Sequence, residues 1–154
     1  MKFYIIPLFV VLFFSGGCIS ENSIDFDNTA DLVFLEEYAG REGVIITQSG
    51  LLYRIIEEGE GEIPESGSRV KIHYILSLVD GTILQNTYEQ DEPFEFEINQ
   101  VIDGLAEGVM LMQEGAIYEL VIPADLAYGV QPPPGSNIHL GATLIFEVEL
   151  LEIL

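Results

Sequence analysis

The sequence contains few of the residue types that carry out chemistry in most enzymes. It has no tryptophan, one cysteine and two histidines, His73 and His139, which lie far apart along the chain. A single cysteine excludes an intramolecular disulfide, and a lone histidine is far more often a surface residue than a metal ligand. The motifs HExxH, GxSxG, CxxC, GxGxxG and the P-loop are also missing. We therefore expect no metal site and no cofactor.

Basic residues are scarce as well, with five Lys and Arg against 26 Asp and Glu and a formal net charge of −21. Binding to nucleic acid needs basic side chains that displace the counterions of the phosphate backbone, so we expect no nucleic-acid partner. The same imbalance disfavours adsorption to anionic lipid. The acidic residues are scattered singly among apolar ones, a pattern that is typical of solvated outer faces.

The N-terminus has the composition of a signal peptide. Lys2 supplies a positive charge, residues 3–14 are apolar apart from one proline, and small residues precede Cys18. This run is too short to cross a bilayer comfortably and has the proportions of a signal. Its end resembles the lipobox of bacterial lipoproteins, with Ser15 where leucine is usual, and the resemblance implies lipidation of Cys18.

We therefore expect residues 1–17 to be a lipoprotein signal peptide. The protein would then be lipid-anchored to a membrane of the bacterial cell envelope, on its periplasmic or outer face. The alternative is an ordinary secretory signal followed by an incidental cysteine.

Two short segments separate the signal from the main domain. Residues 18–28 are polar and lack periodicity, which predicts a flexible tether. Residues 29–42 predict a short helical segment that is capped at Asn28-Thr29 and ends at glycines. Its apolar stripe is Leu32, Leu35 and Ala39, and Phe34 and Tyr38 lie on a neighbouring face. A helix this short is marginal on its own, so we predict a monomer in which the helix docks on its own sheet or frays.

Residues 43–154 have the pattern of one domain with several short strands and one helix. Strand patterns cover residues 43–56, 70–75, 94–98, 117–122 and 144–150, with a hairpin turn at Asp80-Gly81 and loops at 57–68, 85–93 and 130–141. Alternation of apolar residues in the strands predicts one buried face. Helical spacing recurs at Ile102, Leu105, Val109 and Met112, and Gly115 stops the run. The pattern predicts an α+β domain.

Six segments of this domain carry a family resemblance. They are Val70-Lys-Ile-His-Tyr74, Asp80-Gly81-Thr82, Pro93-Phe-Glu-Phe96, Val101-Ile-Asp-Gly-Leu-Ala-Glu-Gly108, Asp125-Leu-Ala-Tyr128-Gly129 and Ala142-Thr-Leu-Ile-Phe146-Glu-Val148-Glu-Leu150. In this order and at these spacings they resemble the FKBP-type peptidyl-prolyl cis-trans isomerases over roughly residues 43–154. The resemblance implies a twisted antiparallel β-sheet wrapped around one short α-helix, with a ligand cleft between them.

Composition alone favours plain core for the inward aromatic and aliphatic side chains, and Phe96 is expected to be core. The resemblance instead places several of the others in a proline pocket. It implies catalytic roles for Tyr74, Phe94, Ile102, Tyr128 and Phe146, and substrate-binding roles for Leu84, Gln85, Val101, Leu105 and Ile138. It also implies that the Ile102 N–H and the Tyr128 hydroxyl donate hydrogen bonds to the ligand.

Three positions depart from the family pattern. Leu84-Gln85-Asn86 stands where Phe-Asp-Ser is usual, Leu105 where Trp is usual, and Ile138-His139-Leu140 where Ile-Pro-Pro is usual. The leading hypothesis is a peptidyl-prolyl isomerase that assists the folding of exported polypeptides, with proline-containing unfolded chains as partners and macrolides as inhibitors. The alternative is a non-catalytic FKBP-fold chaperone or protein-binding module that uses the same cleft.

Overall fold

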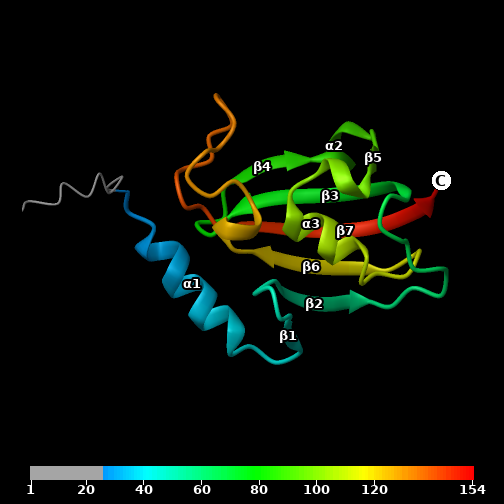
Figure 1. Ribbon diagram of the computed structural model, residues 1–154, viewed down its shortest axis with the longest axis horizontal. Helices are drawn as coiled ribbons and strands as arrows, with labels where there is room; N and C mark the ends of the chain where they lie inside the picture. Colours follow the sequence, from blue (N-terminus) through cyan, green and yellow to red (C-terminus); the bar gives the residue numbers. More distant parts are fainter. Residues whose placement is uncertain (1–25) are drawn as a thin grey trace, which may run out of the picture.

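A computed structural model describes residues 26–154, and these residues form a seven-stranded antiparallel sheet with helices on both faces (Figure 1). In chain order the elements are α1 (Thr29–Ala39), β1 (Val44–Ile46), β2 (Leu52–Glu57), β3 (Arg69–Leu78), β4 (Ile83–Asn86), α2 (Thr87–Gln90), β5 (Phe94–Glu97), the 3-10 helix η1 (Ile98–Gln100), α3 (Asp103–Val109), β6 (Ile117–Ile122), the 3-10 helix η2 (Ala124–Leu126) and β7 (Leu144–Ile153). The strand order is β1-β2-β6-β7-β3-β4, and β5 also pairs with β3. The predicted α+β architecture is confirmed. The predicted signal peptide and Cys18 lie outside the described residues.

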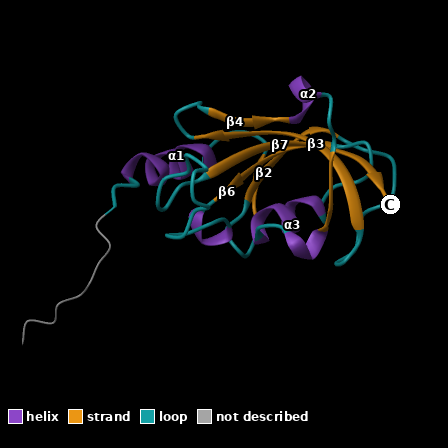
Figure 2. Cartoon of the chain, turned by 90° about the horizontal axis from the view of Figure 1, so that it is seen from above, coloured by secondary structure: helices purple, strands orange, loops and turns teal. Residues whose placement is uncertain are grey.

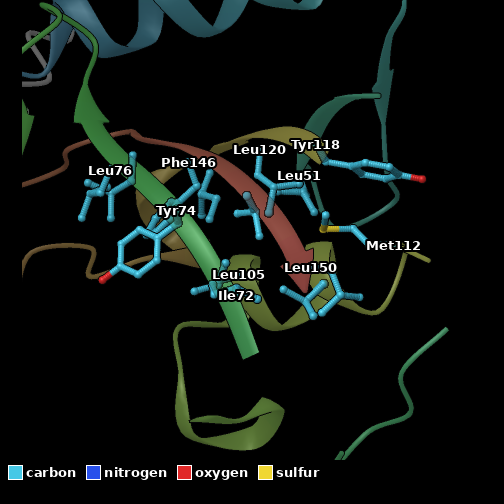
Figure 3. Close-up of a cluster of buried hydrophobic side chains, with 14 of the residues drawn as sticks. Leu51, Ile72, Tyr74, Leu76, Leu105, Met112, Tyr118, Leu120, Phe146 and Leu150 are labelled. Carbon is cyan, nitrogen blue, oxygen red and sulfur yellow. The ribbon is translucent and has the colours of Figure 1, made fainter. Parts of the chain in front are cut away.

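The two longest strands, β3 and β7, form the centre of the sheet. They pair from Val70 opposite Ile153 to Leu78 opposite Leu144. Burial alternates along both strands, as the period of two predicts. The inward side chains of these strands are Val70, Ile72, Tyr74, Leu76, Leu78, Leu144, Phe146, Val148 and Leu150. Figure 3 shows the resulting apolar cluster, which extends from Tyr74, Leu76 and Phe146 at one end to Met112 and Tyr118 at the other.

α3 lies across one face of the sheet and covers this core (Figure 2). Two glycines allow the helix to approach β6 closely. Gly104 lies against Ile122 and Gly108 against Leu120, and at either position a Cβ atom would overlap the facing side chain. The sequence places small residues where the helix backbone meets branched strand side chains.

The helix predicted over residues 101–112 is too long. α3 ends at Val109, and tight turns follow it. The chain must reverse before β6, and the Gly115 N–H donates to the Leu150 carbonyl (2.7 Å) at the end of that reversal. Met112 is nevertheless fully buried, because the turns keep it on the inward side. Its spacing from Val109 therefore indicates that it is buried, not that it belongs to the helix.

α1 packs on the opposite face of the sheet from α3. Tyr38 is 1% exposed and lies against Leu52 and Val121, and Val121 points away from the α3 side because neighbouring residues of a strand face opposite ways. The Tyr38 hydroxyl donates to Glu119 Oε1 (2.6 Å), which also pairs with Arg54 (3.0 Å). A buried ring that keeps a hydrogen bond leaves no polar group unpaired. Of the two predicted alternatives, docking of this helix on its own sheet is therefore confirmed, and fraying is not observed among the described residues.

The face of α1 that turns inward includes only two residues of the predicted stripe, Leu35 and Ala39, which pack against the cluster of Tyr38, Leu52 and Val121. Leu32 is 57% exposed, whereas Asp31 and Tyr38 are the buried residues of the helix. Helical spacing decides which residues share a face but not which face meets the sheet. Here an aromatic ring and a hydrogen-bonded carboxylate are the most buried groups of the interface, and Leu35 and Ala39 pack beside the ring.

Caps and short turns differ most from the prediction. The Asn28 side chain makes no capping bond, and Asp27 accepts from the N–H of Thr29 instead (3.0 Å). Residues 85–93, predicted as a loop, contain the end of β4 and the single turn of α2, which is capped by Asn86.

Among the described residues, no helix has the length and apolar character needed to cross a bilayer.

Candidate functional site

A cleft of about 450 Å³ opens between the sheet and the start of α3. Its lining residues are Tyr74, Leu76, Gln85, Phe94, Gln100, Val101, Ile102, Leu105, Tyr128 and Phe146. β3 and β7 are neighbours in the sheet, so their inward side chains Tyr74 and Phe146 lie next to each other at its base. The remaining walls come from β4, β5, the segment that leads into α3, and the turn after η2.

Eight of the ten predicted site residues line this cleft, namely Tyr74, Phe94, Ile102, Tyr128, Phe146, Gln85, Val101 and Leu105. The other two, Leu84 and Ile138, line an adjacent hollow of about 540 Å³ that shares Leu76, Gln85 and Tyr128 with the cleft. The structure thus brings the predicted set together along one continuous surface. The functional roles assigned to these residues remain predictions.

Two lining residues, Leu76 and Gln100, were not predicted. Leu76 follows Tyr74 on the same face of β3, so the strand alternation was a sufficient signal for it. Gln100 ends η1 directly before Val101, and no sequence pattern marks it. Phe94 also differs from expectation, because it was placed with the inward side chains but is 39% exposed at the rim.

Aromatic rings form a connected wall along the cleft. The ring centroids of Tyr74 and Phe146 are 5.6 Å apart, and those of Tyr74 and Phe94 are 5.9 Å apart in an edge-on arrangement. Phe94 also stacks on buried Phe96 at 5.2 Å, and Phe96 is core as predicted. Contacts of this kind orient rings as well as bury them, so the wall has a defined shape. Leu105, 4% exposed, forms part of the apolar lining.

No charged side chain lines the described cleft. Burial raises the pKa of the Tyr74 phenol, and nearby Tyr128 adds to the shift, while the Gln85 side chain opposes it. A raised phenol pKa keeps this group neutral over a wider pH range. Among residues 26–154, no three His, Cys, Asp or Glu side chains gather closely enough to hold a metal ion. The lining therefore offers apolar contacts and uncharged hydrogen-bonding groups to a ligand.

Two residues that line the cleft, Ile102 and Tyr128, carry hydrogen-bond donors. The Ile102 carbonyl accepts from the N–H groups of Leu105 and Ala106 (3.1 and 3.0 Å), which starts α3, while the Ile102 N–H has no acceptor among the described residues. Tyr128 lies on the turn that follows η2 and is half-buried. That these two donors bind a ligand carbonyl remains a prediction.

The backbone of Tyr74 is fixed from outside the cleft by Thr87. The Thr87 hydroxyl is buried, accepts from the Tyr74 N–H (2.8 Å) and donates to the Tyr74 carbonyl (3.2 Å). His73 Nδ1 lies 2.9 Å from the hydroxyl oxygen of Thr87, and the His73 ring stacks on Tyr88. His73 was predicted to be a plain surface residue, but it is half-buried and belongs to this network.

Comparison with known proteins matches residues 60–151 to a family model described as FKBP-type peptidyl-prolyl cis-trans isomerase. The chain is 49% identical over 121 residues to the FKBP-type 22 kDa peptidyl-prolyl cis-trans isomerase of Escherichia coli (strain K12), which covers 79% of this chain and 58% of that protein. It is 33% identical over 146 residues to the outer membrane protein MIP of Legionella longbeachae, covering 91% of this chain and 62% of that one. The chain therefore spans less than two thirds of these relatives.

Solved structures show the same architecture. The crystal structure of FkpA from Escherichia coli aligns with a TM-score of 0.77 and 37% identity over 81% of this chain and 58% of that one. A peptidyl-prolyl cis-trans isomerase from Pseudomonas syringae aligns with a TM-score of 0.75 and 30% identity over 81% of this chain and 91% of that one.

Proposed function

The chain belongs to the FKBP-type peptidyl-prolyl cis-trans isomerase family, and from this premise we propose that its cleft catalyses the interconversion of cis and trans X-Pro bonds. The observation that carries the proposal is the uncharged, aromatic cleft itself, in which Tyr74, Phe146 and Leu105 surround a space next to two hydrogen-bond donors. The proposed substrates are proline-containing unfolded or exported polypeptides.

The chemistry of the reaction fits such a site. Rotation about a peptide bond is opposed by about 18–20 kcal/mol of lost amide resonance, and uncatalysed X-Pro isomerisation takes tens to hundreds of seconds. No bond is made or broken, so the protein must only bind the twisted amide better than the planar one. An apolar cleft disfavours the charge-separated planar form and holds the proline ring while the preceding carbonyl turns.

The proposed roles follow the positions of the side chains. Tyr74, Phe94 and Phe146 contact the proline ring, and Val101 and Leu105 complete the apolar lining. The Ile102 N–H and the Tyr128 hydroxyl bind carbonyl groups of the substrate. Leu84, Gln85 and Ile138 contact residues that flank the proline, because they line the adjacent hollow. Macrolides would compete for the same surface.

Substitutions in the cleft test this proposal. We expect Tyr128→Phe to lower kcat/KM by about tenfold at unchanged stability, because one hydrogen bond to the rotating amide is lost. Phe146→Ala should lower it further, at a cost of about 3–5 kcal/mol in stability because this ring is buried. The folded fraction is measured by circular dichroism on the same samples. Activity that falls only in step with this fraction would mean that these residues stabilise the core and have no role in catalysis.

We further propose that Cys18 carries a lipid that anchors the protein to the bacterial cell envelope, on its periplasmic or outer face. The signal-like residues 1–17 and the outer-membrane name of the Legionella longbeachae relative support this location. One acyl chain gives only marginal binding, so stable anchoring needs more than one. Labelling cells with palmitate should mark the wild-type chain and not Cys18→Ser. Equal labelling of both chains would contradict lipidation at Cys18.

A second candidate function is a non-catalytic module that binds unfolded chains in the same cleft. Two lining residues favour it, since Gln85 stands where the family carries an acid and Leu105 where it carries tryptophan. A smaller apolar residue in the lining makes fewer contacts with a proline ring. Binding of a proline peptide without acceleration of its isomerisation would identify this function.

A further inference from the structure

The segment from Phe26 to Asp31 precedes the part of the chain that the family model matches, yet it contacts the loop at the mouth of the cleft. This loop, residues 130–141, contains no regular helix or strand. In Figure 1 the start of α1 lies beside it. Long loops without secondary structure hold one conformation only where other parts of the molecule fix them.

Asp31 makes the polar part of this contact. It is 2% exposed, and its carboxylate accepts from the Thr143 N–H (2.6 Å) and lies 2.8 Å from His139 Nε2. A buried carboxylate is costly unless hydrogen bonds satisfy it, so these partners hold the side chain in one place. Because both partners lie where the loop joins β7, the carboxylate fixes the end of the loop relative to α1.

Gly141 makes the apolar part of the contact. Its φ of +72° is a conformation that residues with a side chain rarely adopt, and Phe26 and Asn28 occupy the space that a Cβ atom would need. The chain before α1 thus packs directly onto the backbone at the base of the loop.

Two of the contacted residues, His139 and Gly141, connect to the cleft surface. His139 follows Ile138, which lines the hollow beside the cleft. The Gly141 N–H donates to the Gly129 carbonyl (2.8 Å), and Gly129 follows Tyr128. Movement of residues 139–141 would therefore shift both Ile138 and Tyr128.

We propose that Asp31 is a positioning residue for the isomerase, holding the 130–141 loop so that Ile138 and Tyr128 face the substrate. Its catalytic consequence rests on the proposed function. The segment from Phe26 to Asp31 then helps to shape the substrate-binding site and is not only a spacer. Since Ile138 contacts residues that flank the proline and Tyr128 binds a carbonyl group of the substrate, misplacement of the loop lowers kcat/KM.

The test compares three variants of the full chain. Asp31→Ala removes both hydrogen bonds, Asp31→Asn keeps an oxygen for the Thr143 N–H, and Glu36→Ala removes an exposed carboxylate from the same helix as the matched control. Kinetics on a short X-Pro peptide give KM and kcat, and hydrogen exchange of the Gly141 amide reports the loop without reference to catalysis.

We expect Asp31→Ala to speed exchange at Gly141 and to lower kcat/KM by about fivefold, the equivalent of one net hydrogen bond. Asp31→Asn should recover most of both values, and Glu36→Ala should match the wild type. If Asp31→Ala does not fold, Phe26→Ala tests the same loop, because it removes packing on Gly141 and leaves the hydrogen bonds in place.

Unchanged Gly141 exchange in the folded variant would overturn the proposal, and faster exchange with unchanged kcat/KM would overturn the positioning role. Failure of the proposed function has a different signature, since the wild type itself would then be inactive. In that case the exchange comparison still decides whether Asp31 holds the loop.

Discussion

At the residue scale, one wall of the cleft depends on Thr87, a buried side chain outside the cleft. β4 stops pairing with β3 at Asn86 opposite Ile75, and the Thr87 hydroxyl then satisfies both backbone groups of Tyr74. A side-chain hydroxyl thereby takes over the hydrogen bonds that a continuing strand would have made. The backbone of Tyr74 is thus hydrogen-bonded although β4 does not extend far enough to pair with it.

Replacing Thr87 with valine keeps the shape and removes the hydroxyl. The Tyr74 N–H and carbonyl would then be buried without partners, so we expect Thr87→Val to lower the free energy of unfolding by roughly 1–3 kcal/mol and to lower isomerase activity. Urea denaturation measures the first effect. Thr82→Val, at an exposed hairpin position beside Asp80, is the matched control and should change stability by less than about 0.5 kcal/mol. Equal stability of the two variants would contradict this role of Thr87.

Some single residues could be predicted from the sequence and others could not, for a physical reason. The inward residues of β3 and β7 follow from alternation alone, since a strand has only two faces. The burial of Asp31 could not be predicted, because its partners His139 and Thr143 lie 108 and 112 residues away. The partial exposure of Phe94 depends in the same way on its place at the rim of the cleft.

At the element scale, the distance between α3 and β6 depends on glycine. Gly104 faces Ile122, a β-branched side chain with little rotational freedom, and a Cβ at Gly104 would overlap it. Alanine normally favours helix over glycine by about 1 kcal/mol, so propensity and packing oppose each other at this position.

We expect packing to dominate in Gly104→Ala and to lower stability by about 1–3 kcal/mol. The midpoint of urea unfolding should fall without a change in slope. Gly40→Ala at the end of α1 is the control, because its φ is −84° and a Cβ there would meet only the Glu37 carbonyl oxygen, at 3.7 Å. If Gly104→Ala were as stable as the wild type, α3 would have room to move away from β6.

Element types were predictable to a greater extent than element ends. The strand at 117–122 and the hairpin turn at Asp80-Gly81 appear as predicted, and the helix predicted within residues 29–42 spans Thr29–Ala39. The end of α3 could not be predicted, because turns after Val109 keep Met112 buried and so preserve the helical spacing. The cleft itself needed the family resemblance, since composition alone could not separate its lining from ordinary core.

At the scale of the whole molecule, α1 decides between a monomer and a dimer. Its buried side chains, Tyr38 and Asp31, are already used against the protein's own sheet and loop. The apolar residues that it leaves exposed, Leu32 and Val33, form a small surface. Stable protein–protein interfaces usually bury about 800 Å² on each partner, far more than two side chains supply.

We therefore predict that residues 19–154 are monomeric at tens of micromolar, which sedimentation equilibrium measures directly. The −21 net charge adds repulsion between copies at low salt, so the measurement should be repeated at high salt as a control. A stable dimer that dissociates on deletion of residues 19–42 would mean that this segment is an interface.

The central claim is that the cleft accelerates rotation about X-Pro bonds, and exchange NMR of a short X-Pro peptide with a small amount of residues 19–154 tests it most directly. The uncatalysed interchange takes tens to hundreds of seconds, so exchange peaks between the cis and trans resonances appear only if the protein acts as a catalyst. We predict such peaks, and we predict that Tyr128→Phe weakens them. Shifts of the peptide resonances on binding, without exchange peaks at any protein concentration, would contradict the account and identify a non-catalytic binding module.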